Sequence, residues 1–400
     1  MLKERTYAGF LRKENKDQKV HLLGWVQTRR DHGGVIFVDL RDRSGMVQIV
    51  FNPDMADGGF NLAEKLRSEY VIEVKGYVRL RPEGSENPNM VTGEIEVVAE
   101  QLKILNRAKT PPFYIQDGID VDEAVRLKHR YLDLRRPEMQ KIFITKHKIM
   151  QIMRSFLDQN GFLEIETPIL AKSTPEGARD YLVPSRVNKG CFYGLPQSPQ
   201  IFKQLLMVAG MEKYFQIARC FRDEDLRADR QPEFTQLDIE MSFVEVDDIL
   251  PLMEDLITKI FSEIAGIDIP KPFPRMSYKE AMERFGSDKP DLRFGMELID
   301  VADVVKDSEF KVFTDVLAKG GRVKGICAKN CSKMPRRELD NLTKFVNLYG
   351  AKGLAYIVLA EDGIKSPITK FFTDQQVKNL IAKMGAETGD ILFFVADKES

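Results

Sequence analysis

The sequence is short of cysteine, histidine and long apolar runs. Its 400 residues include four cysteines and four histidines. Only Cys327 and Cys331 lie close together, without a histidine cluster, so reduced thiols are expected and not a zinc site or a disulfide framework. No apolar stretch reaches the ~20 residues that span a bilayer, and the first five residues lack the apolar core of a signal peptide. We therefore expect a cytoplasmic protein without a membrane segment.

The net charge says little about partners. The 60 basic and 61 acidic residues give a formal charge of −1, although 30% of the residues are charged. Nucleic-acid binding would therefore have to come from local patches. At roughly 150 residues per domain, the length predicts about two or three domains, with enough apolar residues for real cores.

The N-terminal region is predicted to form a small β-barrel. Five strand-like runs begin at Val20, Val35, Met46, Tyr70 and Glu94, and a short helical pattern lies between the third and the fourth. Five strands with one helix after the third is the order of an OB-fold, which commonly binds single-stranded nucleic acid on its second and third strands.

The strands of this barrel carry side chains that suit RNA. Cations for phosphates, one aromatic ring for stacking and an amide for a base edge are found at Arg29, Arg30, Phe37, Arg41 and Gln48. A purely structural barrel with Phe37 in its core fits the same alternation of apolar and polar residues.

The most informative segment is a charged run between two apolar strands. Residues 214–221 and 233–243 alternate as strands, and residues 221–240 concentrate cations and carboxylates. Arg222 and Glu224 alternate with Asp223 at a strand end, so their side chains share one face. An arginine fork binds two phosphate oxygens at once and stays charged at any working pH, which indicates a nucleotide site. A solvated hairpin loop can also carry this many charges.

This run closely resembles motif 2 of class II aminoacyl-tRNA synthetases, in the form found in bacterial-type aspartyl-tRNA synthetases. A helical pattern followed by a strand and Pro168, within residues 149–170, resembles motif 1. Residues 173–186 and 195–210 resemble the aspartate-binding segments of the same family. The similarity runs in order from Gly24 to Phe243 and continues more loosely to the end.

The resemblance implies an α+β multidomain fold. An OB-fold anticodon-binding domain is expected at 1–106, a hinge at 107–140, the antiparallel-sheet catalytic part with motifs 1 and 2 at 141–286, and an inserted GAD-like α/β domain at 287–400. No glycine-rich motif 3 with its arginine is found before Ser400. We therefore expect the first two-thirds of a synthetase, either truncated or a natural short form. It would bind tRNA through its barrel but form no adenylate, because its active site is incomplete.

The resemblance assigns the ATP site to four residues. Arg222, the catalytic candidate, would bridge the α-phosphate of ATP and the α-carboxylate of the substrate. Glu224 would hold the adenine end of ATP or a metal ion, which in this family is Mg²⁺. Gln231 falls on another ATP position, and Phe234 would stack on the adenine ring.

The aspartate site would be built from Glu176, Gln200, Lys203 and Arg222. Glu176 suits the substrate ammonium, and Gln200 and Lys203 are spaced to face one ligand from a helix. The ammonium of Lys203 would select a side-chain carboxylate over the neutral amide of asparagine, because an unpaired buried charge penalises the wrong substrate.

The barrel would bind tRNA. Arg29, Phe37 and Gln48 fall on the anticodon-contact pattern of the family. His32, followed by two glycines, resembles enzymes that charge both aspartate and asparagine tRNAs, with Gly84 as a second determinant.

The implied function is that of an aspartate–tRNA ligase. It would activate L-aspartate with ATP to aspartyl-adenylate, transfer it to tRNA-Asp or also to tRNA-Asn, and form a homodimer through motif 1. One alternative is a noncatalytic tRNA- or RNA-binding protein derived from a synthetase. Another is an asparagine- or lysine-specific relative, which Lys203 and the inserted domain disfavour.

Overall fold

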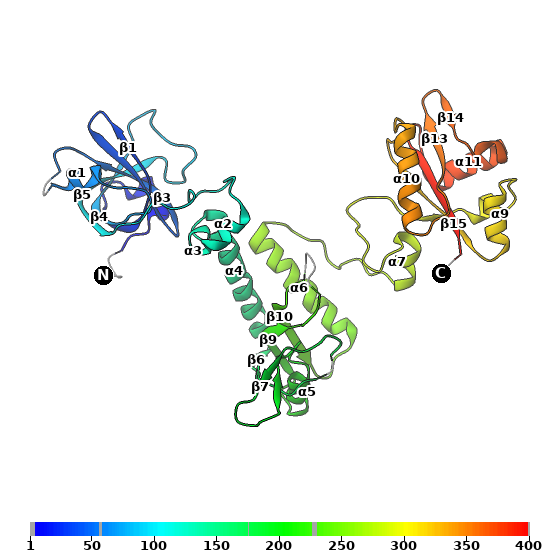
Figure 1. Ribbon diagram of the computed structural model, residues 1–400, viewed down its shortest axis with the longest axis horizontal. Coiled ribbons are helices and arrows are strands. Elements are labelled where there is room, and N and C mark those ends of the chain that lie inside the picture. The colour runs from blue at the N-terminus through cyan, green and yellow to red at the C-terminus, as the bar shows by residue number, and fades with distance from the viewer. Residues whose placement is uncertain (1–4, 56–57, 175, 226–229, 399–400) are drawn as a thin grey trace. The chain divides into compact units, whose positions relative to one another are not determined.

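The computed structural model describes residues 5–55, 58–174, 176–225 and 230–398. Contacts divide the chain into two compact units, Met1–Lys271 and Pro272–Ser400 (Figure 1). Among the described residues, no helix has both the length and the apolar character needed to cross a membrane.

The first unit begins with a closed five-stranded barrel. Two short 3₁₀ turns, η2 (Ala8–Phe10) and η3 (Lys13–Asn15), precede β1 (Lys19–His32), β2 (Val35–Asp42), β3 (Gly45–Phe51), α1 (Gly59–Glu64), β4 (Val71–Leu80) and β5 (Ile95–Asn106). The strands close in the order β1-β2-β3-β5-β4, with one helix after the third. The predicted OB-fold is therefore confirmed.

Alternation along β2 decides which side chains fill the barrel. Ile36, Val38 and Leu40 are fully buried in its core, whereas Phe37 and Asp39 are half-buried and lie on the other face of the strand. The alternative with Phe37 in the barrel core is therefore wrong.

A hinge of short helices follows the barrel. It contains α2 (Glu123–Lys128) and α3 (Arg130–Asp133), and a small apolar core of Phe113, Ile115 and Leu132 packs beneath it. The side chain of Asp122 accepts a hydrogen bond from the Ala124 N–H and caps α2.

The rest of the first unit is built around a long antiparallel ribbon. Its elements are α4 (Pro137–Gln159), β6 (Leu163–Glu164), β7 (Leu182–Pro184), β8 (Phe192–Gly194), α5 (Gln200–Val208), β9 (Lys213–Phe221), β10 (Glu233–Met241) and α6 (Val246–Ala265). The sheet order is β10-β9-β6, with β6 parallel to β9, and β7 pairs with β8 separately.

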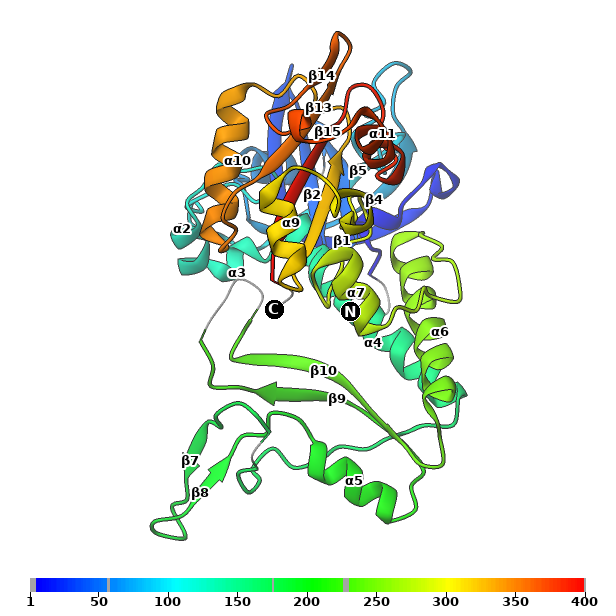
Figure 2. The ribbon, with the colours of Figure 1, turned by 90° about the vertical axis from the view of Figure 1, so that its right-hand side faces the viewer.

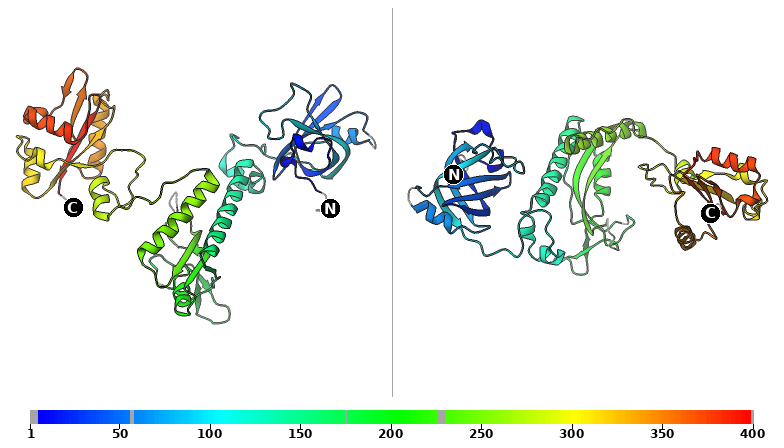
Figure 3. Two further views of the ribbon diagram at one scale, coloured as in Figure 1. Left: turned by 180° about the vertical axis from the view of Figure 1, so that it is seen from behind. Right: turned by 90° about the horizontal axis from the view of Figure 1, so that it is seen from above.

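Two helices cover one face of this ribbon. α4 and α6 lie side by side (Figure 3). Leu157 of α4 packs with Phe215 of β9 and Leu237 and Ile239 of β10, and Leu252 of α6 joins the same core. All three strand residues are odd-numbered, so the even-numbered residues of β9 and β10 face the opposite side.

The second unit is an antiparallel sheet with helices on both faces. It contains α7 (Tyr278–Phe285), β11 (Ile299–Asp300), α8 (Ala302–Val305), α9 (Lys311–Ala318), β12 (Arg322–Ala328), α10 (Arg336–Leu348), β13 (Ala355–Ala360), β14 (Gly363–Lys365), η5 (Thr369–Phe371), α11 (Asp374–Lys383) and β15 (Ile391–Asp397). The strand order is β11-β12-β15-β13-β14. One core lies under α10, and the other lies under α8, α9 and α11 (Figure 2).

The second unit begins earlier than the sequence indicates. The Leu298 N–H donates to the Arg284 carbonyl at 2.6 Å, and Lys324 Nζ donates to the Glu283 carbonyl at 2.7 Å. α7 therefore packs on the sheet of the second unit, which begins before residue 287.

Candidate active site and RNA-binding face

The even-numbered residues of the β9–β10 ribbon form the floor of the candidate active site. Tyr214 pairs with Glu240, Gln216 with Asp238, and Cys220 with Phe234. Helix α5 contacts both strands. Because cross-strand partners share a face, these polar side chains lie opposite the apolar core.

Lys203 reaches this floor from α5. Its Nζ lies 2.8 Å from Asp238 Oδ1 and 3.3 Å from Glu240 Oε2, and its side chain is 12% exposed. Burial alone would lower the pKa of Lys203, but the hydrogen bond and charge of Asp238, with Glu240, raise it above its ordinary value. The ammonium is therefore charged and held in place.

Asp238 and Glu240 are site residues that the sequence reading missed. Burial raises the pKa of Asp238 despite its bond to Lys203, and the nearby charge of Glu240 adds to this. Burial and Asp238 also raise the pKa of Tyr214, which therefore stays a hydroxyl donor. Strand alternation alone predicts that Asp238 and Glu240 share one face, but it does not predict that Lys203 contacts them.

Arg222 stands at the end of β9, on the same face. Its guanidinium lies over the Phe234 ring, with its carbon 5.0 Å from the ring centroid. Among the described residues, its buried Nε has no hydrogen-bond partner. A buried donor without a partner is costly, so this atom is suited to an incoming anion.

A pocket of about 330 Å³ opens beside Arg222. Its lining brings together all four residues expected to bind ATP, with three neighbours: Arg222, Glu224, Asp225, Arg230, Gln231, Pro232 and Phe234. An aromatic face next to an arginine fork fits the base and the phosphates of a nucleotide.

The acids of this pocket offer a partial shell for a cation. Arg230 Nη1 donates to Glu224 Oε2 at 3.0 Å, and Asp225 is a second carboxylate in the lining. Within the part of the chain that the structure describes, no three His, Cys, Asp or Glu residues gather as a metal site. Mg²⁺ is often held by one or two carboxylates with substrate phosphates and water, and Glu224 and Asp225 fit that mode.

Glu176 is held near the start of α5. Its carboxylate accepts hydrogen bonds from Thr174 Oγ1 at 3.1 Å and from Ser198 Oγ at 2.7 Å. Gln200 is half-buried at the first residue of α5, one turn before Lys203. The structure thus brings Glu176 to the helix that carries the other two aspartate-site candidates.

Gln197 is a second residue that the sequence reading missed. It is buried, accepts from the Ala178 N–H at 3.1 Å, and donates to the Ala178 carbonyl at 2.8 Å and to Asp180 Oδ1 at 2.5 Å. The Asp223 N–H donates to the Arg179 carbonyl at 3.0 Å. These bonds join the loop of Glu176 both to α5 and to the segment of Arg222.

The outer face of the barrel gathers Phe37, Gln48 and Arg30. Gln48 donates to Glu96 Oε2 at 2.9 Å and accepts from Arg30 Nη2 at 3.1 Å, and Arg30 lies directly across from Phe37. This face presents one aromatic ring and a cation, and the Gln48 amide is buried beside them with its oxygen and its nitrogen hydrogen-bonded.

Arg29 lies apart from that group. It pairs with the core residue Val38, and its Nε donates to the Ala63 carbonyl of α1 at 3.2 Å. The structure therefore brings Arg30, and not Arg29, beside Phe37 and Gln48.

His32 stands at the tip of the β1–β2 turn. Its ring lies edge-on to Phe37 with 6.1 Å between centroids, and Gly33 and Gly34 follow with φ of 63° and 84°. Gly84 lies in the β4–β5 connection, also at positive φ (80°). His32 is thus next to the aromatic ring of the outer face.

Helix α4 exposes a run of apolar side chains. Ile142, Phe143 and Ile144 are all exposed. Beside them, α4 and the ribbon line an apolar pocket of about 530 Å³ that includes Met150 and Leu237. An uncovered apolar surface of this kind is typical of an interface.

Two family models match the chain. Residues 122–395 match "tRNA synthetases class II (D, K and N)", and residues 20–105 match "OB-fold nucleic acid binding domain". The first covers more than half of the chain, including the candidate active site.

The chain is also similar to proteins named Aspartate--tRNA(Asp/Asn) ligase. It is 64% identical over 399 residues to that of Heliobacterium modesticaldum, covering 100% of this chain and 66% of the relative. It is 59% identical over 393 residues to that of Moorella thermoacetica, covering 98% of this chain and 65% of the relative. The chain thus spans about two-thirds of the length of the curated relatives it matches.

Two solved structures are similar in fold. One is a putative aspartyl-tRNA synthetase from Leishmania major Friedlin, with a TM-score of 0.57 and 25% identity over 66% of this chain and 53% of that chain. The other is asparaginyl-tRNA synthetase from Pyrococcus horikoshii complexed with asparaginyl-adenylate, with a TM-score of 0.61 and 19% identity over 98% of this chain and 93% of that chain. At 19% identity, this second likeness concerns the fold alone. With the family matches and the relatives, these findings show that the chain belongs to the class II tRNA synthetases for aspartate, lysine and asparagine, in the bacterial-type aspartyl branch.

Proposed function

We propose that the protein is an aspartate–tRNA ligase that activates L-aspartate with ATP and passes the aspartyl group to tRNA. The observation that carries this proposal is the common face of the β9–β10 ribbon. Lys203 contacts it at Asp238 and Glu240, and Arg222 covers it at Phe234. The ammonium of Lys203 and the guanidinium of Arg222, which suits phosphate, therefore both lie on this face of the ribbon.

The first step needs positioning and charge compensation, and no nucleophilic side chain. An oxygen of the aspartate α-carboxylate attacks the α-phosphorus of ATP, the bond to the bridging oxygen of the β-phosphate breaks, and pyrophosphate leaves. Two anions must meet, and the Arg222 guanidinium reduces their repulsion by donating to both. Its unpartnered buried Nε supports this role.

The nucleotide would occupy the pocket next to Arg222. Phe234 provides a stacking face, and Gln231 and Glu224 provide polar contacts at the lining. Mg²⁺ bound with Glu224 and Asp225 would supply positive charge to offset the departing phosphates. The Glu224–Arg230 pair orders this side of the pocket.

Aspartate would be chosen by Lys203. An ammonium has three donors, and Asp238 and Glu240 take two of them, so one remains for the substrate side-chain carboxylate. Asparagine would place an amide NH₂ or a neutral oxygen there and leave the charge poorly matched. Glu176 supplies a carboxylate for the substrate ammonium, held by Thr174 and Ser198.

The tRNA would be gripped by the outer face of the barrel. Phe37 would stack on an anticodon base, Gln48 would read a base edge, and Arg30 and Arg29 would neutralise phosphates. His32 beside Phe37, with Gly84, would admit the anticodons of both tRNA-Asp and tRNA-Asn. Relatives named for both tRNAs support this wider choice.

A homodimer would cover the exposed apolar residues of α4. The surface formed by Ile142, Phe143 and Ile144 lies on the motif 1 helix and is continuous with an apolar pocket. Burial of such side chains in a second copy removes apolar area from water.

The proposal is tested by charging purified tRNA-Asp and tRNA-Asn with labelled aspartate and, in parallel, with labelled asparagine. Because the 400 residues alone are expected to bind tRNA without forming an adenylate, the assay uses the protein at the full length of its relatives. In that protein we expect aspartate to be attached to both tRNAs and asparagine to neither. Tight tRNA binding without attachment of any amino acid would favour a noncatalytic RNA-binding protein instead.

A further inference from the structure

Glu69 occupies a backbone conformation that is unfavourable for it. Its φ is 66°, in the left-handed region that glycine and asparagine tolerate best. The residue is 3% exposed and lies just before β4, where its N–H donates to the Val26 carbonyl at 2.7 Å. A buried, charged, non-glycine residue in this conformation indicates that the side chain is needed there.

The carboxylate of Glu69 joins the barrel to the hinge. Arg41 of β2 donates to both of its oxygens through Nη2, at 2.8 and 2.9 Å. Arg135, from the hinge, donates to Oε2 at 2.6 Å. The Arg135 guanidinium also lies over the Trp25 ring of β1, with its carbon 5.2 Å from the centroid.

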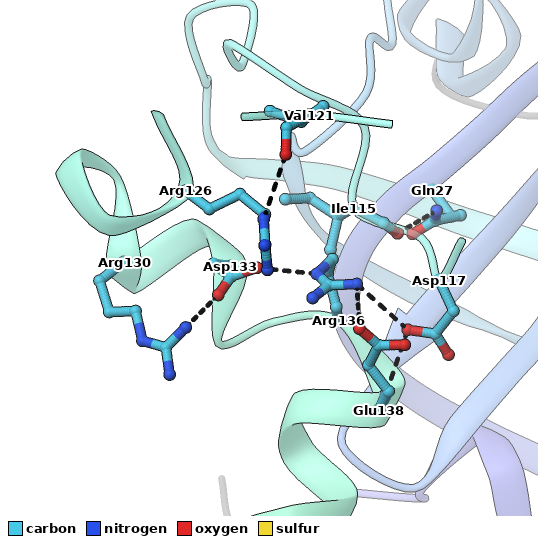
Figure 4. Close-up of polar contacts among 9 residues, drawn as sticks. All are labelled: Gln27, Ile115, Asp117, Val121, Arg126, Arg130, Asp133, Arg136 and Glu138. Carbon is cyan, nitrogen blue, oxygen red and sulfur yellow. Dashed lines mark hydrogen bonds and ion pairs between the residues drawn. The ribbon is translucent and has the colours of Figure 1, made fainter. Parts of the chain in front are cut away.

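The cluster of Arg41, Glu69 and Arg135, called the clamp below, continues on its hinge side into α4. Arg136 is buried and donates to Asp133 Oδ1 at 2.8 Å, and it pairs with Glu138 at 2.5 Å in the first turn of α4 (Figure 4). Burial would raise the pKa of Asp133, but Arg136 and Arg130 outweigh it and hold this pKa below its ordinary value. Two sets of paired charges, Arg41–Glu69–Arg135 and Asp133–Arg136–Glu138, are thus joined through the backbone between Arg135 and Arg136.

Loss of the Glu69 carboxylate would turn this clamp into a repulsion. Arg41 is buried, and its pKa is lowered by that burial and further by the nearby charge of Arg135. Without the shared anion, two guanidinium groups would face each other in a low-dielectric place. The hinge would then separate from the barrel at this point.

We propose that Glu69 is a positioning residue that fixes the RNA-binding barrel on the hinge and on the first turn of α4. A tRNA held by the barrel is thereby presented to the catalytic part in one orientation. This inference rests on the proposed function for its effect on charging. The clamp itself is independent of that function.

The clamp is tested directly by the fluorescence of Trp25, the single tryptophan of the chain. In Glu69→Gln, we expect the acrylamide quenching constant of Trp25 to rise about twofold as Arg135 leaves the ring and the local structure opens. Arg135→Gln should give the same rise while leaving the Arg41–Glu69 pair inside the barrel. The matched control is Glu73→Gln, which removes a 2.8 Å pair with His21 within the barrel and should leave quenching unchanged. Unchanged quenching in folded Glu69→Gln and Arg135→Gln would overturn the clamp.

The consequence for function is tested by three measurements on Glu69→Gln and Arg135→Gln: tRNA charging, pyrophosphate exchange and binding of an anticodon stem–loop. We expect kcat/KM for tRNA charging to fall about 10- to 100-fold, because small misplacements of a bound substrate are costly. Aspartate-dependent pyrophosphate exchange and binding of an isolated anticodon stem–loop should stay within about twofold, since chemistry and barrel face are untouched. Undiminished charging, or an equal loss of stem–loop affinity, would contradict a positioning role. Absence of exchange in the unmodified protein at the full length of its relatives would instead refute the proposed function, and the Trp25 result would still stand.

Discussion

Arg222 and Arg219 lie three residues apart but face opposite sides of the β9–β10 ribbon. Arg222 covers Phe234 in the nucleotide pocket, whereas Arg219 is exposed and lies 3.3 Å from Glu233. The difference follows from strand alternation, which turns even-numbered residues toward the candidate site. Two arginines of similar sequence context therefore have different expected roles.

Replacement of Arg222 by lysine keeps the charge but removes the planar fork. We expect the rate of aspartate-dependent pyrophosphate exchange to fall about 100-fold, the usual cost of losing a donor to a developing anion. Thermal stability should stay nearly unchanged, because the backbone N–H of residue 222 still donates to the Pro232 carbonyl. Arg219→Lys is the control and should retain full exchange. Equal losses in both variants would argue against a specific role for Arg222.

The family resemblance assigned four residues to one ligand, and their role in binding ATP stays a prediction. Arg222, Glu224, Gln231 and Phe234 do line one pocket. Arg29 was assigned to the RNA-binding face by the resemblance, but a register shift between Val26 and Thr28 reverses the alternation of β1. Simple counting from the buried residues of β1 would turn Arg29 outward, but the shift turns Arg30 outward instead.

Individual elements could be predicted better than the contacts between them. The five strands of the barrel and the β9–β10 ribbon follow from alternation, and their order was confirmed. The pairing of Lys203 with Asp238 and Glu240 depends on how α5 packs across the ribbon, which local patterns do not determine. For the same reason, the contacts of Glu69 with Arg41 and Arg135 could not be predicted from the sequence.

Asp390 joins two connections at one end of the second sheet. It accepts hydrogen bonds from the Asn330 N–H at 3.0 Å, the Glu387 N–H at 2.9 Å and Lys329 Nζ at 2.9 Å. Burial alone would raise its pKa, but these donors lower the pKa to about 2. The carboxylate therefore stabilises the elements that it joins.

The lowered pKa of Asp390 predicts an acid-sensitive contribution to stability. Because the unfolded pKa is about 3.9, this contribution is complete above that pH and is lost as the pH falls toward about 2. Asp390→Asn should lower the unfolding free energy at neutral pH and flatten its decline between about pH 4 and 2. Denaturant titrations at several pH values measure this. An unchanged slope in the variant would show that Asp390 is not responsible.

The proposed homodimer would form through the exposed apolar surface of α4. Phe143→Glu places a charge within the exposed apolar surface of Ile142, Phe143 and Ile144, and it should shift the protein from dimer toward monomer in sedimentation velocity. Asp158→Lys, exposed near the other end of the same helix, is a charge-change control that should leave the dimer intact. A monomeric unmodified protein would remove the basis for this interface.

The whole molecule combines separate cores with different tasks. The barrel has its own core and carries the candidate RNA-binding face. The ribbon with α4 and α6 carries the candidate active site, and the second unit has a core on each face of its sheet. Composition indicated several domains, but the start of the second unit depended on contacts of α7 that no boundary signal marks. The proposed activation of aspartate depends on residues that lie on the β9–β10 ribbon or contact it.

The most direct test of the account is aspartate-dependent ATP–pyrophosphate exchange in Lys203→Met, with asparagine as the competing substrate. At the full length of its relatives, the unmodified protein should use aspartate and reject asparagine, and Lys203→Met should lose exchange with aspartate by about 100-fold or more. Lys203→Arg keeps the pair with Asp238 and guards against a loss of folding, and Lys213→Met serves as a lysine control on β9. If folded Lys203→Met still prefers aspartate at an undiminished rate, the assignment of this face as the aspartate-activating site is contradicted.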